Sequence, residues 1–211
     1  MDVKARMAIG IMGGTFDPVH NAHLQMALEA QRNLGLDSVR LVPCHRPPHR
    51  DCPSLCSEQR LHLLTLATED SDVIEVDDRE LQRNKASYTV DTLLSLREEL
   101  GDEVSLVFLL GMDAFSHLTS WYKWEKLRAL THIAVMTRPN SPAPKDGVLA
   151  DWLANIDSPS IVHQQAAGGL LLLEQSLLPI SATAIREQLL HSKSVDDLPP
   201  KVAEYLASIN E

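Results

Sequence analysis

Two histidines, His20 and His23, stand three residues apart, directly after a polar turn that contains Gly13 and Gly14. Three residues is close to one helical turn, so both side chains share a face if a helix begins there. Imidazole rings at such a place can offer hydrogen bonds or positive charge to phosphate oxygens. The spacing therefore predicts a phosphate site, and the alternative is an ordinary tight turn with surface histidines.

The elements around this turn fit a phosphate site. An apolar run from Met7 to Met12 precedes the turn, and a helical pattern from Leu24 to Leu34 follows it. In α/β proteins, a strand, a glycine turn and a helix N-terminus in this order bring unpaired backbone N–H groups and the positive helix end together. Neither the G-x-G-x-x-G fingerprint nor the G-x-x-x-x-G-K-[ST] loop occurs in the chain.

A second helix start carries phosphate-binding side chains near the C-terminus. Ser181 and Thr183 offer hydroxyls, and Arg186, one turn later, can fork onto phosphate oxygens. Alone, this pattern is typical of a simple helix cap. Together with the histidine turn, it predicts two helix N-termini that hold a triphosphate from both sides of one cleft.

A carboxylate follows another buried strand. The apolar run from Val104 to Leu110 is followed by Gly111 and Asp113. A carboxylate at the end of a parallel strand can accept hydrogen bonds from a ribose or lie near a metal ion. The alternative is that Asp113 caps the helix that follows.

Both phosphate motifs resemble those of the nucleotidylyltransferase superfamily. The first resembles its GG-T-F-D-P turn followed by His-x-Gly-His, with Ala22 in place of the usual glycine, and the second resembles its Ile-Ser-Ser/Ala-Thr-x-Ile-Arg motif. Because alanine is the smallest replacement, we expect the turn to survive. The resemblance implies that His20, His23 and Arg186 are catalytic, with His23 stabilising the transition state. It assigns to ATP the residues Gly13, Gly14, Thr15, Phe16, Gly111, Asp113, Ser181 and Thr183.

Further segments narrow the resemblance to the bacterial nicotinate mononucleotide adenylyltransferases. They are Pro47–Arg50, Ser87–Leu93, Trp121-Tyr122 and Arg138-Pro139, and the resemblance runs from about Met7 to Ala207. It implies transfer of AMP from ATP to nicotinate mononucleotide, which gives nicotinate adenine dinucleotide and pyrophosphate. The residues it assigns to the mononucleotide are Arg50, Tyr88, Thr89, Trp121, Tyr122 and Arg138.

The chemistry of these residues suits a nicotinate ring. Trp121 offers a flat face for stacking, and backbone N–H groups near Thr89 and Tyr122 can hold a carboxylate. Simple core or edge packing is the alternative for the Trp-Tyr pair. Two other functions stay open: an adenylyltransferase for nicotinamide mononucleotide or another small phosphate, and a non-catalytic nucleotide-binding domain.

Mg²⁺ is the expected cofactor, brought in with ATP and held mostly by phosphate and water. No protein metal site is expected. Cys44, Cys52 and Cys56 lie in one loop-like region, so a zinc site is conceivable. Their C-x7-C-x3-C spacing matches none of the common paired zinc motifs, and reduced thiols are expected.

Apolar runs alternate with helical patterns along the chain, which predicts a Rossmann-like, doubly wound parallel α/β sheet in one domain, 1–211. The sheet core is expected over about 7–174 and a helical part over about 181–209. Residues 145–165 are expected to form a peripheral helix. The predicted strands are Met7–Met12, Val39–Pro43, Val73–Val76, Val104–Leu110, His132–Met136 and Leu170–Leu173. The predicted helices are Ala22–Leu34, Ser57–Thr68, Thr89–Leu100, Trp124–Leu130, Ala182–Leu190 and Pro199–Ile209.

The composition of the chain indicates which classes of binding partner to expect. The chain has 211 residues and a formal net charge of −10, which argues against a nucleic-acid backbone as partner. Because the N-terminus is polar, we expect no signal peptide, and no apolar run approaches the roughly 20 residues that span a bilayer. We therefore expect a cytoplasmic enzyme without a membrane partner. The sequence does not indicate an oligomeric state.

Overall fold

The computed structural model describes residues 6–45, 53–83, 85–137, 142–174, 180–191 and 195–209. Its centre is a six-stranded sheet in which every neighbouring pair is parallel, in the order β3-β2-β1-β4-β5-β6. The strands are β1 (Ala8–Gly14), β2 (Ser38–Pro43), β3 (Ile74–Val76), β4 (Ser105–Gly111), β5 (His132–Thr137) and β6 (Leu170–Glu174). The predicted doubly wound parallel sheet is confirmed.

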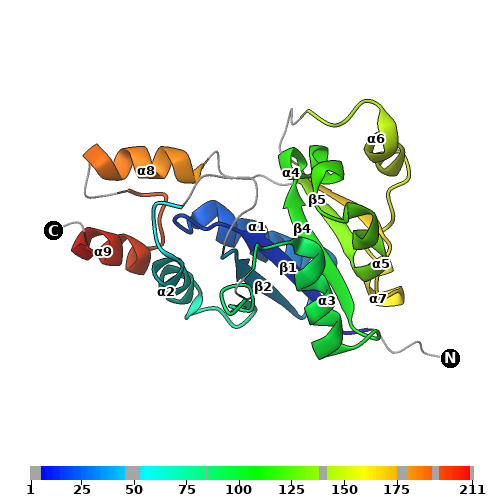
Figure 1. The fold of residues 1–211 in the computed structure, drawn as a ribbon, viewed down its shortest axis with the longest axis horizontal. Helices are drawn as coiled ribbons and strands as arrows, with labels where there is room; N and C mark the ends of the chain where they lie inside the picture. The colour runs from blue at the N-terminus through cyan, green and yellow to red at the C-terminus, as the bar shows by residue number, and fades with distance from the viewer. Residues whose placement is uncertain are drawn as a thin grey trace.

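Helices cover both faces of the sheet (Figure 1). One face packs against α1 (Asn21–Leu34), α2 (Ser57–Thr68) and α7 (Ile161–Gln164), and α8 (Ala182–His191) and α9 (Pro200–Ile209) add buried side chains to the same apolar cluster. The other packs against α3 (Thr89–Leu100), α4 (Met112–Ser116), α5 (Leu127–Leu130) and α6 (Gly147–Leu153). Strands β1 and β4 are buried along almost their whole length, because a parallel sheet covered on both faces needs apolar side chains on both.

The strand order reverses between β1 and β4. From β1 the chain adds β2 and β3 on one side, then returns across the sheet to add β4, β5 and β6 on the other. Ligands of such sheets bind at this switch point, outside the carboxyl ends of the strands. Gly13 and Gly14 end β1 there, and Gly111 ends β4 beside them.

The predicted elements differ from the structure in a few places. The glycines of the first motif belong to the end of β1, and the helix predicted over Trp124–Leu130 is divided into a short 3-10 helix, η2 (Trp124–Lys126), and α5. The 145–165 segment holds two short helices, α6 and α7, which bury Leu149 and Val162 against the sheet. The helix α4 and the 3-10 helix η1 (Leu118–Ser120) were not predicted.

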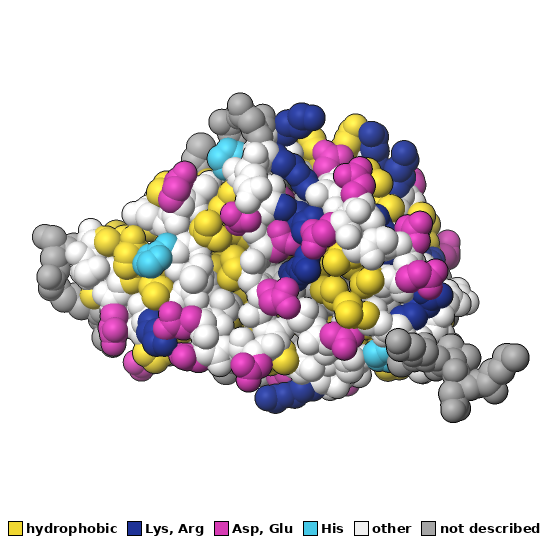
Figure 2. All heavy atoms as spheres, turned by 90° about the horizontal axis from the view of Figure 1, so that it is seen from below, with side chains coloured by type: hydrophobic (Ala, Val, Ile, Leu, Met, Phe, Trp, Pro, Cys, Tyr) yellow, Lys and Arg dark blue, Asp and Glu magenta, His cyan; other side chains and the backbone are white. Residues whose placement is uncertain are grey.

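Helices α8 and α9 lie at the same end of the molecule, where α9 packs against α2 (Figure 1). Within the described ranges, the structure has no helix long and apolar enough to cross a membrane. Figure 2 shows a face on which acidic and basic side chains are interspersed, with small apolar patches between them.

Candidate active site

A cavity of about 1320 Å³ opens at the switch point between β1 and β4. The two phosphate motifs meet there, although about 160 residues separate them in the sequence. The predicted residues that line this cavity are Gly13, Gly14, Thr15, Phe16, His20, His23, Gly111, Asp113, Trp121, Ser181, Thr183 and Arg186. Phe108, Met112 and His117 also line it, and the sequence analysis did not single them out.

Close packing explains the second glycine of the turn. Phe16 has a φ of 49°, in the left-handed region, and this conformation folds its buried ring under Gly14. A Cβ atom added to Gly14 would lie 2.9 Å from Cζ of that ring. The floor of the cavity therefore requires a residue without a side chain at position 14.

Arg60 supports this turn from below, and the sequence analysis missed it. Its buried guanidinium donates to the Thr15 carbonyl at 2.7 Å and to the Ser57 hydroxyl at 3.1 Å. Arg60 lies three and four residues before the buried Leu63 and Leu64 of α2. A cation in the apolar stripe of a helix is the signal that could have revealed it, because buried charges are retained only with partners.

The two histidines form a stacked pair, with ring centroids 3.7 Å apart. The backbone N–H of His20 donates to Nδ1 of His23 at 3.3 Å, so a neutral His23 ring carries its proton on Nε2. The ring of His23 also meets Phe16 edge-on, at 5.0 Å between centroids. Burial, helped by the neighbouring His20, lowers the pKa of His23 to about 3. Before a ligand binds, His23 is thus a neutral hydrogen-bond donor rather than a cation.

The N-terminus of α1 has fewer free backbone N–H groups than the sequence predicts. His20 is the N-cap residue, and the backbone N–H of Asn21 donates to the Asp197 carbonyl at 3.0 Å. That donor is therefore engaged by the segment before α9. Ala22, which stands where the resembling superfamily has glycine, is buried in the first turn of α1 and lines the cavity.

Arg186 joins the two motifs directly. Its Nη1 donates to the Asp17 backbone carbonyl at 2.7 Å and lies 3.8 Å from the Asp17 carboxylate, while Nη2 donates to the Thr183 hydroxyl at 3.2 Å. The same carboxylate accepts the backbone N–H groups of Ser54 and Leu55 at 2.8 and 3.0 Å. Asp17 therefore holds Arg186 and the segment before α2 against one side of the cavity.

Both predicted helix caps can now be assigned. The Ser181 hydroxyl accepts the backbone N–H of Ala184 at 3.2 Å, so Ser181 caps α8 while it lines the cavity. The alternative that Asp113 is an N-cap is wrong. Gly111 is the N-cap of α4, and Asp113 lies in the first turn with an exposed side chain that lines the cavity.

The cytidylyltransferase-like family model matches residues 11–188. A protein of Cellvibrio japonicus named "Probable nicotinate-nucleotide adenylyltransferase" is 44% identical over 203 residues, which are 95% of this chain and 96% of that protein. One of the same name from Aeromonas hydrophila is 42% identical over 203 residues, 94% of each chain.

The chain belongs to the nicotinate-nucleotide adenylyltransferase family. The solved structures agree at the level of the fold. The Plasmodium falciparum nicotinic acid mononucleotide adenylyltransferase complexed with NaAD aligns with a TM-score of 0.73 at 21% identity, and the alignment covers 97% of both chains. The same protein complexed with APC gives a TM-score of 0.70.

Of the described residues that the family resemblance assigns to a mononucleotide, Trp121 is the one that lines the cavity. Its ring meets Phe108 edge-on, with centroids 6.1 Å apart. The rings of Tyr88 and Tyr122 are 4.6 Å apart, which joins the start of α3 to the segment after η1. In the described part of the chain, Tyr88, Thr89 and Tyr122 are not among the residues that line the cavity.

The sequence analysis proposes the backbone N–H groups of Thr89 and Tyr122 as donors to a carboxylate. Tyr88 is the N-cap of α3, and its carbonyl accepts the N–H groups of Asp91 and Thr92 at 3.0 and 3.2 Å. Among the described residues, neither Thr89 nor Tyr122 has an acceptor for its backbone N–H. Backbone N–H groups without an acceptor, one of them at a helix start, can hold a small anion such as a carboxylate.

Some predicted residues lie outside the described part of the chain, namely Arg50, Arg138 and Cys52. Of the other cysteines, Cys44 is half-buried with its Sγ 3.7 Å from the Thr15 hydroxyl, and Cys56 is exposed. Burial raises the pKa of the Cys44 thiol. Among the described residues, no group of three or more His, Cys, Asp or Glu side chains is placed so that it could hold a metal ion.

Proposed function

We propose that this protein transfers AMP from ATP to nicotinate mononucleotide and releases pyrophosphate. The observation that carries the proposal is the meeting of both phosphate motifs in one cavity that has Trp121 at its edge. The relatives at 42–44% identity that carry this activity in their names support the same substrates. The NaAD bound to the Plasmodium falciparum enzyme, which has the same fold, supports these two substrates too.

The reaction needs no nucleophile from the protein, because the mononucleotide phosphate is itself an anion. One of its oxygens forms a bond to the α-phosphorus of ATP. The bond from that phosphorus to the oxygen that bridges it to the β-phosphorus breaks, and pyrophosphate carries away the electron pair. The protein must hold two anions together and stabilise charge on the phosphoryl oxygens.

The residues of the cavity suit these tasks. His23 presents a neutral Nε2–H donor, which interacts with a phosphoryl oxygen more strongly as charge develops on that oxygen. Arg186 is already fixed by the Asp17 carbonyl and Thr183, so it loses little side-chain freedom when it contacts the β- and γ-phosphates. Gly14 and Phe16 form the floor below the nucleotide.

We propose Mg²⁺ as the metal that accompanies ATP. The exposed carboxylate of Asp113 at the cavity wall is an oxygen ligand of the kind Mg²⁺ uses, often with only one or two protein carboxylates. The Asp17 carboxylate is less suitable, because Ser54 and Leu55 already donate to it. When bound, Mg²⁺ would neutralise part of the triphosphate charge.

The backbone donors of Thr89 and Tyr122 support nicotinate as the preferred ring. A carboxylate accepts both N–H groups, whereas an amide would direct its own NH₂ group toward one of them. Hydrogen bonds to charged groups are worth about 1.5–3 kcal/mol, and an unsatisfied buried donor costs about 1–3 kcal/mol. Together these predict about 10²-fold or more discrimination in kcat/KM.

The test is pyrophosphate release by the purified protein from ATP with each mononucleotide, with Mg²⁺ and with excess EDTA. We expect turnover with nicotinate mononucleotide that needs Mg²⁺, and at least about 10²-fold lower kcat/KM with nicotinamide mononucleotide. Equal efficiency for acid and amide would move the enzyme to the nicotinamide or dual-specificity class. No pyrophosphate with either would leave only a nucleotide-binding domain.

A further inference from the structure

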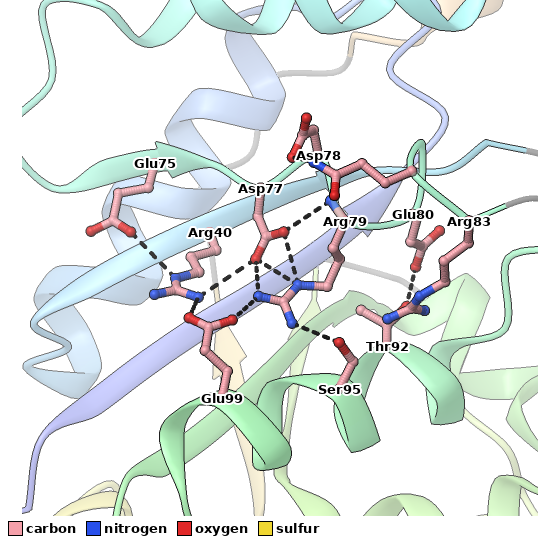
Figure 3. Close-up of polar contacts among 11 residues, drawn as sticks. Arg40, Glu75, Asp77, Asp78, Arg79, Glu80, Arg83, Thr92, Ser95 and Glu99 are labelled. Carbon is pink, nitrogen blue, oxygen red and sulfur yellow. Dashed lines mark hydrogen bonds and ion pairs between the residues drawn. The ribbon is translucent and has the colours of Figure 1, made fainter.

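One stripe of α3 carries polar side chains along its length. Thr89, Thr92, Ser95 and Glu99 recur at spacings of three and four residues, which places them on one face of the helix. The segment 77–83, which follows β3, lies along this stripe (Figure 3). None of the residues of this segment was assigned a role by the sequence analysis.

The far end of the stripe is held by arginines. Arg79 donates through Nε to both carboxylate oxygens of Asp77 at 2.8 Å, through Nη1 to the Ser95 hydroxyl at 3.1 Å, and through Nη2 to Glu99. Arg40 of β2 donates to the other oxygen of Glu99 at 2.9 Å and lies 3.6 Å from Asp77. These contacts tie the second and third turns of α3 to β2 and to the 77–83 segment (Figure 3).

The near end of the stripe is held through one hydroxyl. Thr92 donates to the carboxylate of Glu80 and accepts from Nη1 of Arg83 at 3.0 Å. Thr92 and Glu80 are 3% and 7% exposed, so water competes little for these bonds. Because the hydroxyl uses both its donor and an acceptor position, its place is fixed from two sides.

We propose that Glu80, Thr92 and Arg83 are positioning residues for the mononucleotide: they fix the first turn of α3 so that the Thr89 N–H points at the nicotinate carboxylate. The inference rests on the proposed function. Thr92 lies one turn after Thr89, about 4.5 Å along the helix axis, so the two residues move together. The neighbouring Tyr88 ring contacts Tyr122, which keeps the second donor in register with the first.

The contacts at the far end of α3 provide the matched control. Ser95 belongs to the same stripe and also bonds an arginine of the 77–83 segment, but it lies two turns from Thr89. If these contacts only stabilise the helix, their loss at Thr92 and at Ser95 should have the same effect on the kinetics. A contact that places the Thr89 donor should affect the mononucleotide only when it is lost at Thr92.

The experiment compares Thr92→Val, which keeps the shape and removes the hydroxyl, with Ser95→Ala and with Thr92→Ser, which restores the hydroxyl. For each, KM for both substrates, the acid-to-amide ratio of kcat/KM and Tm are measured. For Thr92→Val we expect about a tenfold rise in KM for nicotinate mononucleotide, KM for ATP within about twofold, and a lower acid-to-amide ratio. Thr92→Ser and Ser95→Ala should stay within about threefold of the wild type in every kinetic value.

The inference is wrong if Thr92→Val and Ser95→Ala change KM alike, or if KM for ATP rises with that for the mononucleotide. Should Thr92→Val not fold, Arg83→Met removes one of the two bonds to the hydroxyl and must show the same selective rise in KM, or the inference fails. A wild-type protein inactive with both mononucleotides would instead refute the proposed function. An active wild type with unselective variants would refute only the role of Glu80, Thr92 and Arg83.

Discussion

The surroundings of His23 decide whether its imidazole is neutral or charged. The spacing of the two histidines predicts either hydrogen bonds or positive charge. In the structure, burial and then the stacked ring of His20 lower the pKa of His23 to about 3. The neutral form with its proton on Nε2 is therefore the one that the proposed nucleotide substrate would contact. A neutral imidazole can still donate its strongest hydrogen bond in the transition state, because charge develops on the phosphoryl oxygens there.

His23→Ala should lower kcat by about 10²-fold or more, the usual loss when a donor to a developing charge is removed. Tm should fall only by a few degrees, because the ring also accepts the His20 N–H and such a helix-start contact is worth about 0.5–2 kcal/mol. Steady-state kinetics and thermal unfolding measure both effects, and His62→Ala on α2 is the control histidine. Unchanged turnover would remove His23 from the mechanism.

The residues that the sequence could not assign are those whose partners come from distant segments. Asp17 is visible within the first motif, but its bonds to Ser54, Leu55 and Arg186 depend on how the chain folds back. Arg60 is equally visible within a helix, but nothing in the sequence places the Thr15 carbonyl beside it. Motif chemistry pointed to twelve of the residues that line the cavity, whereas these supports required the structure.

At the scale of elements, periodicity predicted nearly all of the sheet and its long helices. The predicted helices Ser57–Thr68 and Thr89–Leu100 match α2 and α3 at both ends, and β5 starts at His132 as predicted. The misses are short: α4 has five residues and η1 has three, too few for a 3.6-residue period to be seen. Their positions follow instead from the end of β4 and the buried side chains that they place.

The segment before α2 depends on one carboxylate, which gives an element-scale prediction for Asp17→Asn. Asparagine can accept at only one oxygen, so one of the two backbone donors, Ser54 or Leu55, faces an NH₂ group. We expect a loss of about 1–3 kcal/mol in unfolding free energy, or about 2–4 °C in Tm for each kcal/mol. Denaturant unfolding measures it. Asp113→Asn, which removes an exposed carboxylate from the same cavity, should leave Tm unchanged, and an equal loss in both variants would contradict this role.

The segment after η1 should set ring selectivity separately from ring stacking. Trp121→Ala should weaken both mononucleotides alike, because stacking does not sense the acid or amide group. Tyr122→Pro removes one backbone N–H and should lower the preference for the acid itself. The measurement is kcat/KM for both mononucleotides, with Tm to detect distortion of the segment. If Trp121→Ala changed the acid-to-amide ratio while Tyr122→Pro left it intact, these two assignments would have to be exchanged.

For the whole molecule, the topology accounts for how two distant motifs form one site. The reversal of strand order places the ends of β1 and β4 side by side, and α8 returns to this point with Arg186. The far edges of the sheet contribute in another way: β2 and the segment after β3 hold α3 through Arg40 and Arg79. The strands at the centre of the sheet thus form the cavity, and the β2–β3 side of the sheet holds helix α3 in place.

Global stability should fall on mild acidification because buried histidines resist protonation. His132 is fully buried, accepts the Gly169 N–H at Nδ1 and donates from Nε2 to the Gln165 carbonyl, both at 2.9 Å. Burial lowers its pKa, as it does that of His23. The unfolded chain takes up these protons below a pKa of about 6.5 and the folded chain does not. Stability is therefore full above about pH 6.5 and falls as the pH drops, by at most about 1.4 kcal/mol per pH unit for each histidine.

The measurement is urea unfolding without nucleotide at several pH values between 5 and 7.5, for the wild type and for His132→Gln, which keeps an N–H donor without titrating. Glu80 acts in the opposite direction, because burial raises its pKa, so the wild-type slope alone mixes the two effects. The difference between the two proteins isolates His132. We expect His132→Gln to be less stable at pH 7.5 and to lose less of its stability on acidification. Parallel pH curves for the two proteins would show that His132 is protonated as readily in the folded chain as in the unfolded one.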